Sequence, residues 1–196
     1  HLDYIAAMGF TMVWPTPVLE NRQPRHSYHG YALTDFYRVD PRFGSNQDYV
    51  DFVAAARQRG VGVLQDVVLN HIGTGHWWMQ DLPDDNWIHQ PRGSYVQTNH
   101  RHTTVMDPHA APRDRAQFLQ GWFDTSMPDL NQRHLLLARY LVQNSIWWIE
   151  QADLSGIRED TFSYADPAFL QQWTASVLRE YPQFNIVGEE MQDKPH

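Results

Sequence analysis

Apolar residues gather into runs along the chain, and the clearest of these runs is VGVLQDVVL at residues 61–69. The run is nearly unbroken and rich in Val, which is typical of a strand covered on both faces in a parallel sheet. Shorter apolar runs predict further strands at residues 10–18, 153–160 and 184–190. Prolines end the first of these, because proline cannot donate a hydrogen bond to a neighbouring strand.

Between these runs, apolar residues recur at helical spacing. Ser45 is a predicted N-cap and Gly60 a predicted stop for a helix at residues 45–60. Further helices are predicted at residues 132–151 and at residues 167–178, the second of which opens with a proline. Strands that alternate with helices indicate a parallel sheet with right-handed crossovers, either doubly wound or a (β/α) barrel.

Residues 72–131 interrupt this alternation and are rich in Trp, His, Asp and Pro. A segment of this length without regular structure is usually functional or a small subdomain. We therefore predict a catalytic domain in two parts, residues 1–71 and 132–196, with an inserted irregular domain at residues 72–131.

Composition and charge narrow the class of protein. The formal net charge is −8 and the 15 Lys and Arg residues are scattered, which argues against nucleic acid as a partner. The absence of cysteine excludes a disulfide framework and a thiol nucleophile. We find no membrane span or signal peptide in the sequence. The chain opens within a predicted helix at residues 1–9, so any targeting segment would lie before residue 1, and periplasmic and cytoplasmic locations both stay open. The oligomeric state also stays open.

Polar residues stand at the ends of three predicted strands, and ligands of parallel α/β folds bind at the carboxyl ends of strands. These residues are Asp66, Asn70 and His71 after the second strand, Arg158, Glu159 and Asp160 after the third, and Glu189 and Glu190 after the fourth. Side chains alternate along a strand, so Arg158 and Asp160 share one face whereas Glu159 points the other way.

Asp160 and Glu189 form a candidate catalytic pair. Carboxylates at the ends of adjacent strands are expected about 5–6 Å apart, and a retaining glycosidase needs about 5–5.5 Å between its two carboxylates. Arg158 is expected to lower the pKa of Asp160 and keep this nucleophile ionised, which leaves Glu189 as the proton donor. Spacing alone leaves open that these acids only cap helices or pair with arginine.

Several motifs resemble those of the alpha-amylase family of glycoside hydrolases. Its first three conserved regions are matched in order by DVVLNH at 66–71, GIREDTF at 156–162 and IVGEE at 186–190. Residues 28–45 resemble the segment before the first region, and MPDLN at 127–131 resembles the fifth. MPDLN and residues 141–158 favour the neopullulanase and cyclomaltodextrinase branch of the family.

This resemblance implies a partial (β/α)8 TIM barrel of about four strands with an inserted domain B, acting on α-glucan oligosaccharides such as maltodextrins. Asp160 would be the nucleophile and Glu189 the acid and base, with Arg158 fixing the nucleophile. His71 would donate to sugar hydroxyls, and Tyr31 would stack on a sugar ring. Preference for α-1,4 links, α-1,6 links or cyclodextrins stays open, as does hydrolysis against transfer.

The resemblance also bears on cofactors and completeness. Asn70 corresponds to a calcium ligand of many relatives, so calcium is a candidate ion, although the reaction requires no cofactor. A complete barrel has eight strands and about 250 residues, and the third family carboxylate is expected in a later segment. We expect the chain to be a fragment with open strand edges that hydrolyses little or nothing by itself.

Some positions depart from the family pattern. Relatives usually carry apolar residues at Gln65, Glu159 and Glu190, and a residue other than proline at Pro15. An unpaired charge in a buried strand costs several kcal/mol or shifts its pKa until it is neutral, so reduced stability or activity is expected. Relatives also carry Lys and His where this chain has Ser163 and Tyr164.

Two rival functions are retained. A metal-dependent barrel hydrolase would use HRH at residues 100–102 as a zinc pair, although we expect loop histidines here to be solvated. A non-catalytic carbohydrate-binding protein would line a sugar groove with aromatic residues of the insertion, which more often build a small core. These aromatic residues are Trp77, Trp78, Trp87 and Trp122.

Overall fold

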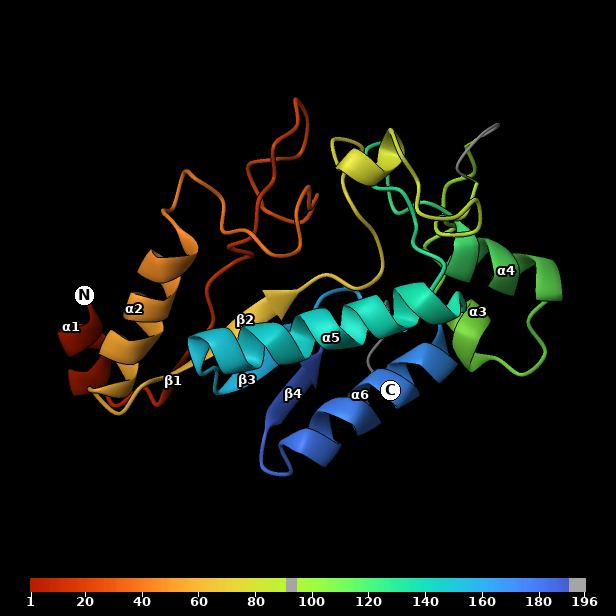
Figure 1. Cartoon of the computed structure of the whole chain (residues 1–196). Coiled ribbons are helices and arrows are strands. Elements are labelled where there is room, and N and C mark those ends of the chain that lie inside the picture. Colours follow the sequence, from red (N-terminus) through yellow and green to blue (C-terminus); the bar gives the residue numbers. More distant parts are fainter. Residues whose placement is uncertain (91–94, 191–196) are drawn as a thin grey trace.

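Four parallel strands form one sheet in the order β1–β2–β3–β4 (Figure 1). The computed structural model describes residues 1–90 and 95–190. The strands are β1 (Met12–Val13), β2 (Gly62–Val67), β3 (Gly156–Glu159) and β4 (Asn185–Gly188). The predicted parallel sheet is confirmed, and its strands follow chain order as in part of a (β/α)8 barrel. β1 is shorter than predicted and ends before Pro15, which cannot join the ladder.

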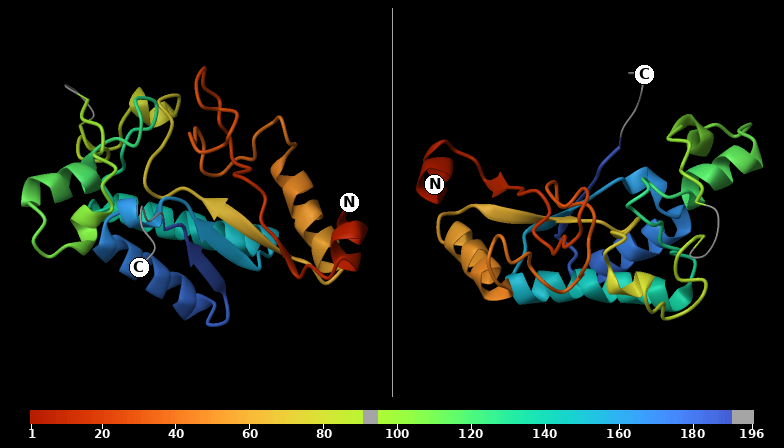
Figure 2. Two further views of the ribbon diagram at one scale, coloured as in Figure 1. Left: turned by 180° about the vertical axis from the view of Figure 1, so that it is seen from behind. Right: turned by 90° about the horizontal axis from the view of Figure 1, so that it is seen from above.

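Three helices cover one face of the sheet (Figure 2): α2 (Asn46–Arg57), α5 (Leu135–Ala152) and α6 (Pro167–Glu180). A capping box starts α2, because Ser45 and Asp48 each accept a hydrogen bond from the other's backbone N–H. Asp166 caps α6 by accepting from the amides of Ala168 and Phe169. A shorter helix, α1 (Leu2–Ala7), precedes β1. Among the residues described, no helix is both long and apolar enough to cross a membrane.

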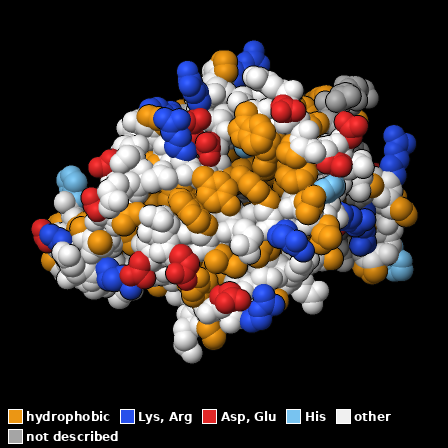
Figure 3. All heavy atoms as spheres, in the orientation of Figure 1, with side chains coloured by type: hydrophobic (Ala, Val, Ile, Leu, Met, Phe, Trp, Pro, Cys, Tyr) orange, Lys and Arg blue, Asp and Glu red, His pale blue; other side chains and the backbone are white. Residues whose placement is uncertain are grey.

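The apolar core lies between these helices and the sheet. Trp148 of α5 and Trp173 of α6 are fully buried there with Val63 of β2 and Ile157 of β3. Burying side chains of this kind stabilises a fold by about 1.5–3 kcal/mol each. Figure 3 shows the helix-covered side, where a band of apolar side chains crosses the molecule between charged ones. The other face of the sheet, which is the interior in a closed barrel, leaves Val187 of β4 52% exposed.

The inserted segment lies beyond the carboxyl ends of β2 and β3 (Figure 1) and is not wholly irregular. It contains η1 (Trp77–Met79), α3 (Thr103–Met106) and α4 (Pro112–Gln120). Trp78 and Trp87 are buried and join the main core, whereas Trp77 is 54% exposed. The hypothesis that all four tryptophans of the insertion line a sugar groove is therefore wrong, because Trp78 and Trp87 build core. The predicted boundaries at residues 71/72 and 131/132 stay predictions.

Two polar side chains enter the core from the sheet. Gln65 of β2 is 1% exposed and Glu159 of β3 is 0% exposed, and their side-chain polar atoms have no hydrogen-bond partner among the described residues. Burial raises the pKa of Glu159 well above its ordinary value, and the charge of Asp160 adds to this rise. The expected buried polar groups are thus present at both positions. Glu190 differs from the expectation, because it follows β4 and its side chain is 39% exposed.

Replacing Glu159 with Gln is expected to flatten the dependence of stability on pH. A carboxyl whose pKa is raised on folding contributes its full stability below its unfolded pKa of about 4.5, and loses it as pH rises toward the folded pKa. Between pH 5 and pH 8, E159Q is therefore expected to lose less unfolding free energy than the parent chain, by at least about 1 kcal/mol. Denaturant unfolding followed by circular dichroism measures this difference. The exposed Glu180 supplies the control variant E180Q, and equal pH slopes in E159Q and the parent would contradict the expectation.

Candidate active site

Arg158 lies at the centre of a cluster of acids on the sheet face that the helices leave open. Its Nη1 atom is 3.0 Å from Asp66 Oδ2 and 2.9 Å from Asp160 Oδ1, and its Nη2 atom is 2.8 Å from Glu189 Oε1. The register explains this convergence, because Asp66 of β2 pairs with Arg158 of β3, and Glu159 pairs with Gly188 of β4. The structure thus brings the predicted residues Arg158, Asp160 and Glu189 together on one guanidinium.

Asp160 is only 5% exposed, and its backbone N–H donates to the carbonyl of Val67 at 2.8 Å. Burial raises the pKa of Asp160 to about 7, with the charge of Asp66 adding to the rise and Arg158 opposing it. Arg158 lowers this pKa, as expected, but burial and Asp66 outweigh it, so the net pKa lies above its ordinary value. One guanidinium shared among three carboxylates does not outweigh their burial and mutual repulsion.

Glu189 is held from two sides. Its Oε1 atom contacts Arg158, and its Oε2 atom accepts a hydrogen bond of 3.0 Å from the backbone N–H of Thr161. The Glu189 side chain is 29% exposed, which makes it the more accessible of the predicted catalytic carboxylates. Sequence reasoning did not find Thr161, which acts through its backbone.

Asp66 joins the cluster to two aromatic rings. Its Oδ2 atom accepts from Trp14 Nε1 at 2.9 Å and from the Tyr31 hydroxyl at 3.3 Å. The Arg158 guanidinium carbon lies 4.8 Å from the centre of the Trp14 ring and 5.8 Å from that of Tyr31. Burial raises the pKa of Asp66 to about 6. Trp14 was missed by sequence reasoning, because the predicted strand at residues 10–18 ran past it, whereas β1 ends at Val13.

His71 lies behind Tyr31 and is 1% exposed. Its Nε2–H donates to the Tyr31 carbonyl at 3.0 Å, and its Nδ1 is 3.3 Å from the Asn70 amide nitrogen. Burial lowers the pKa of His71 to about 4, so the ring is neutral. Phe123 of the insertion stacks on it at 5.2 Å. The structure therefore places His71 beside Tyr31, with both of its ring nitrogens engaged within the chain.

Asn70 was the predicted calcium ligand, and its Oδ1 atom is buried without a hydrogen-bond partner in the described part of the chain. Calcium requires six to eight oxygen ligands. Residues 1–90 and 95–190 contain no group of three or more His, Cys, Asp or Glu residues suited to a metal. One orphaned amide oxygen does not make a calcium site, so calcium stays a prediction.

The HRH histidines do not form a metal pair with a third His, Asp or Glu ligand in the described ranges. His102 is 6% exposed, so the expectation of solvated loop histidines is wrong for this residue. Its Nε2 atom and the Nδ1 atom of His100 lie 3.2 Å and 3.0 Å from the Tyr164 hydroxyl. These rings instead join the insertion to the segment after β3.

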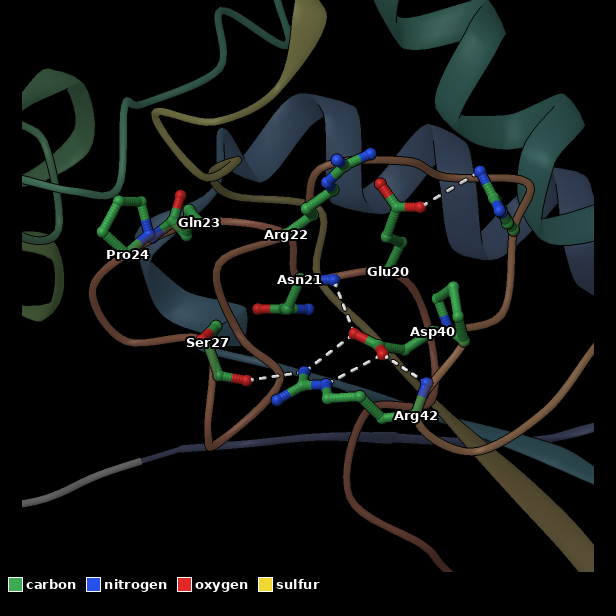
Figure 4. A pocket seen from close by; sticks show the side chains of 10 residues that line it. Glu20, Asn21, Arg22, Gln23, Pro24, Ser27, Asp40 and Arg42 are labelled. Atoms are coloured by element: carbon green, nitrogen blue, oxygen red, sulfur yellow. Dashed lines mark hydrogen bonds and ion pairs between the residues drawn. The ribbon is translucent and has the colours of Figure 1, made fainter.

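A cavity of about 550 Å³ lies among residues 20–42, and none of the predicted site residues lines it (Figure 4). Its carboxylates are already neutralised, because Asp40 receives 2.8 Å and 2.7 Å bonds from Arg42, and Glu20 pairs with Arg38 at 3.4 Å. Arg42 holds the pKa of Asp40 at about 2. Asp40 also accepts a hydrogen bond from the backbone N–H of Asn21, so these contacts stabilise the loop that carries Tyr31.

Replacing Asp66 with Asn is expected to lower the pKa of Asp160 from about 7. The change removes one negative charge and leaves Arg158 with two carboxylates, so the expected fall is roughly one unit or more. A pH titration of carboxyl ¹³C chemical shifts measures it. Asp81 is exposed in the insertion, so D81N is the matched control. An Asp160 pKa that stays constant or rises in D66N would show that repulsion from Asp66 is unimportant.

Comparison with known proteins assigns the family. The family model described as "Alpha amylase, catalytic domain" matches residues 1–196. A cyclomaltodextrinase of Geobacillus thermopakistaniensis is 29% identical over 189 residues, which cover 96% of this chain and 30% of that enzyme. The alpha-amylase mde5 of Schizosaccharomyces pombe is 29% identical over 172 residues, which cover 86% of this chain and 32% of that protein. The chain thus spans about a third of the length of these relatives.

A solved structure supports the same assignment. The alpha-amylase of Geobacillus thermoleovorans complexed with acarbose superposes with a TM-score of 0.81 and 34% sequence identity, covering 98% of this chain and 39% of that one. Cyclomaltodextrinases and maltogenic amylases among the relatives agree with the branch that the motifs favoured. The chain belongs to the alpha-amylase family of glycoside hydrolases, and its four parallel strands match part of that family's catalytic barrel.

Proposed function

We propose that this protein is a retaining glycoside hydrolase of α-glucan oligosaccharides such as maltodextrins, with Asp160 as nucleophile and Glu189 as acid and base. The observation that carries the proposal is the single guanidinium of Arg158, which holds both carboxylates at the ends of adjacent strands. Family membership supports it, as does the acarbose-bound alpha-amylase that is 34% identical to this chain. The activity is proposed for the whole protein, because the chain spans only part of its relatives.

Two displacements make up the reaction. Ionised Asp160 attacks the anomeric carbon as the glycosidic bond breaks, and Glu189 gives its proton to the leaving oxygen. Glu189 then takes a proton from water, whose oxygen attacks the same carbon and releases Asp160. Arg158 supports the first displacement because it opposes the rise in the pKa of Asp160 that burial causes.

Tyr31 and His71 are proposed to bind the sugar. The Tyr31 hydroxyl donates to Asp66, and the Tyr31 backbone carbonyl accepts from His71. A pyranose can therefore stack on a ring that is already held in place. For His71 to donate to a sugar hydroxyl, its Nε2–H must leave the Tyr31 carbonyl. Binding of the sugar and the position of Tyr31 are therefore coupled.

The full-length protein is expected to release shorter maltooligosaccharides from maltoheptaose, with β-cyclodextrin and pullulan as parallel substrates to assign linkage. D160N and E189Q are each expected to lower kcat by about 10³-fold or more, because each removes a group that reacts. D81N is the control and should retain parental kcat. Sugar binding without turnover in the parent protein would support the non-catalytic carbohydrate-binding alternative instead.

The pH dependence of kcat/KM is expected to report the ionisation of Asp160. The nucleophile must be deprotonated and burial raises its pKa to about 7, so kcat/KM should rise with pH toward that value. The same step needs the proton of Glu189, so the rise should not continue at higher pH. Initial rates on maltoheptaose between pH 4 and pH 9 measure the profile. A rate that falls steadily over that interval would contradict the assignment of Asp160 as a buried nucleophile.

A further inference from the structure

The segment Thr161–Tyr164, which follows Asp160, determines where the Glu189 carboxyl lies. The Thr161 N–H donates to Glu189 Oε2 at 3.0 Å, and the Phe162 N–H donates to the Glu189 carbonyl at 3.1 Å. The segment also packs directly on β4, since a Cβ added at Gly188 would lie 2.6 Å from the Phe162 ring. Displacing this segment would therefore release one of the two groups that hold the carboxyl.

The backbone of this segment needs support from outside. Thr161 has a φ of 48°, in the left-handed region that β-branched residues rarely adopt. Such a conformation is strained and persists only where surrounding contacts enforce it. The contacts with Glu189 come from one side, so the other end of the segment requires its own anchor.

Two histidines of the insertion supply that anchor. His102 Nε2 lies 3.2 Å from the Tyr164 hydroxyl, and His102 Nδ1 lies 3.2 Å from Ser163 Oγ. His100 Nδ1 lies 3.0 Å from the same Tyr164 hydroxyl. The Tyr164 ring is buried, with its face stacked on Phe118 at 4.4 Å. A residue about sixty positions away in sequence thus contacts both Ser163 and Tyr164.

His102 also reaches the end of β4. Its Nδ1 atom is 3.7 Å from Glu190 Oε1, and Glu190 directly follows Glu189. Among the described residues, the charged and titratable groups that face His102 are therefore Tyr164, His100 and Glu190. A neutral imidazole donates at one nitrogen and accepts at the other. With its proton on Nδ1, the His102 ring donates to Ser163 Oγ or faces the Glu190 carboxylate, and Nε2 accepts from the Tyr164 hydroxyl.

We propose that His102 is a positioning residue, which fixes the Thr161–Tyr164 segment and through it the Glu189 carboxyl. The insertion then acts on the site indirectly, through its contacts with Ser163 and Tyr164. The catalytic consequence rests on the proposed function, whereas the positioning itself does not.

Amide hydrogen exchange tests the positioning without any need for turnover. In H102A, the Thr161 and Phe162 amides are expected to exchange about tenfold faster than in the parent chain. The Asp160 amide bonds to Val67 within the sheet and should keep its rate. H102Q retains a donor and an acceptor and should restore most of the protection. Y164F removes only the shared hydroxyl, and it is expected to give the same loss of protection should H102A fail to fold.

Kinetics of the full-length protein test the consequence for catalysis. On maltoheptaose, H102A and Y164F are expected to lower kcat about tenfold while KM changes less than about twofold, and H102Q should recover most of kcat. The control is H109A, at an exposed histidine of the same insertion. Unchanged Thr161 exchange in both H102A and Y164F, or acceleration shared equally with Asp160, would overturn the positioning role. An inactive parent protein would refute the proposed function, and the exchange experiment would still decide the role of His102.

Discussion

One guanidinium facing three carboxylates determines the chemistry of this site. Arg158 contacts Asp66, Asp160 and Glu189, so the cluster carries an excess of negative charge when every member is ionised. Burial makes such an excess costly, and repulsion between the carboxylates adds to the cost. The pKa values of Asp66 and Asp160 rise to about 6 and 7 in consequence. Arg158 therefore limits how far the pKa values of Asp66 and Asp160 rise. It does not keep Asp160 alone fully ionised.

Much of the site's geometry follows from strand periodicity. The alternation of side chains was sufficient to predict that Arg158 and Asp160 share a face and that Glu159 does not. Placing Glu189 beside them required only that the strands be parallel neighbours. The lowering of the Asp160 pKa by Arg158 was predicted, whereas the net rise was not, because it depends on burial and on Asp66, whose register with Arg158 is a property of the folded sheet.

The contacts that the insertion makes with the rest of the chain could not be predicted from the sequence. His102 and Tyr164 are separated by about sixty residues, and neither periodicity nor a capping signal relates them. The same holds for Phe123, which stacks on His71 from the far end of the insertion. Both contacts pass through a segment whose own secondary structure was predicted as irregular, although it contains the helix α4. Long-range packing of a loop-rich segment is specified by shape complementarity among side chains, which a linear pattern does not encode.

The two faces of β3 are coupled electrostatically although they are separated by the backbone. Glu159 points into the apolar core, and the charges of Asp160, Asp66 and Glu189 contribute to the rise in its pKa. The interaction is mutual, so a proton retained on Glu159 makes ionisation of Asp160 less costly. Were Glu159 ionised, the cluster would gain a fourth negative charge with no further cation among its contacts. The acid buried on the helix side is therefore compatible with the carboxylate cluster when it is protonated, and burial favours that form by raising its pKa. The stability of β3 depends on pH as a result.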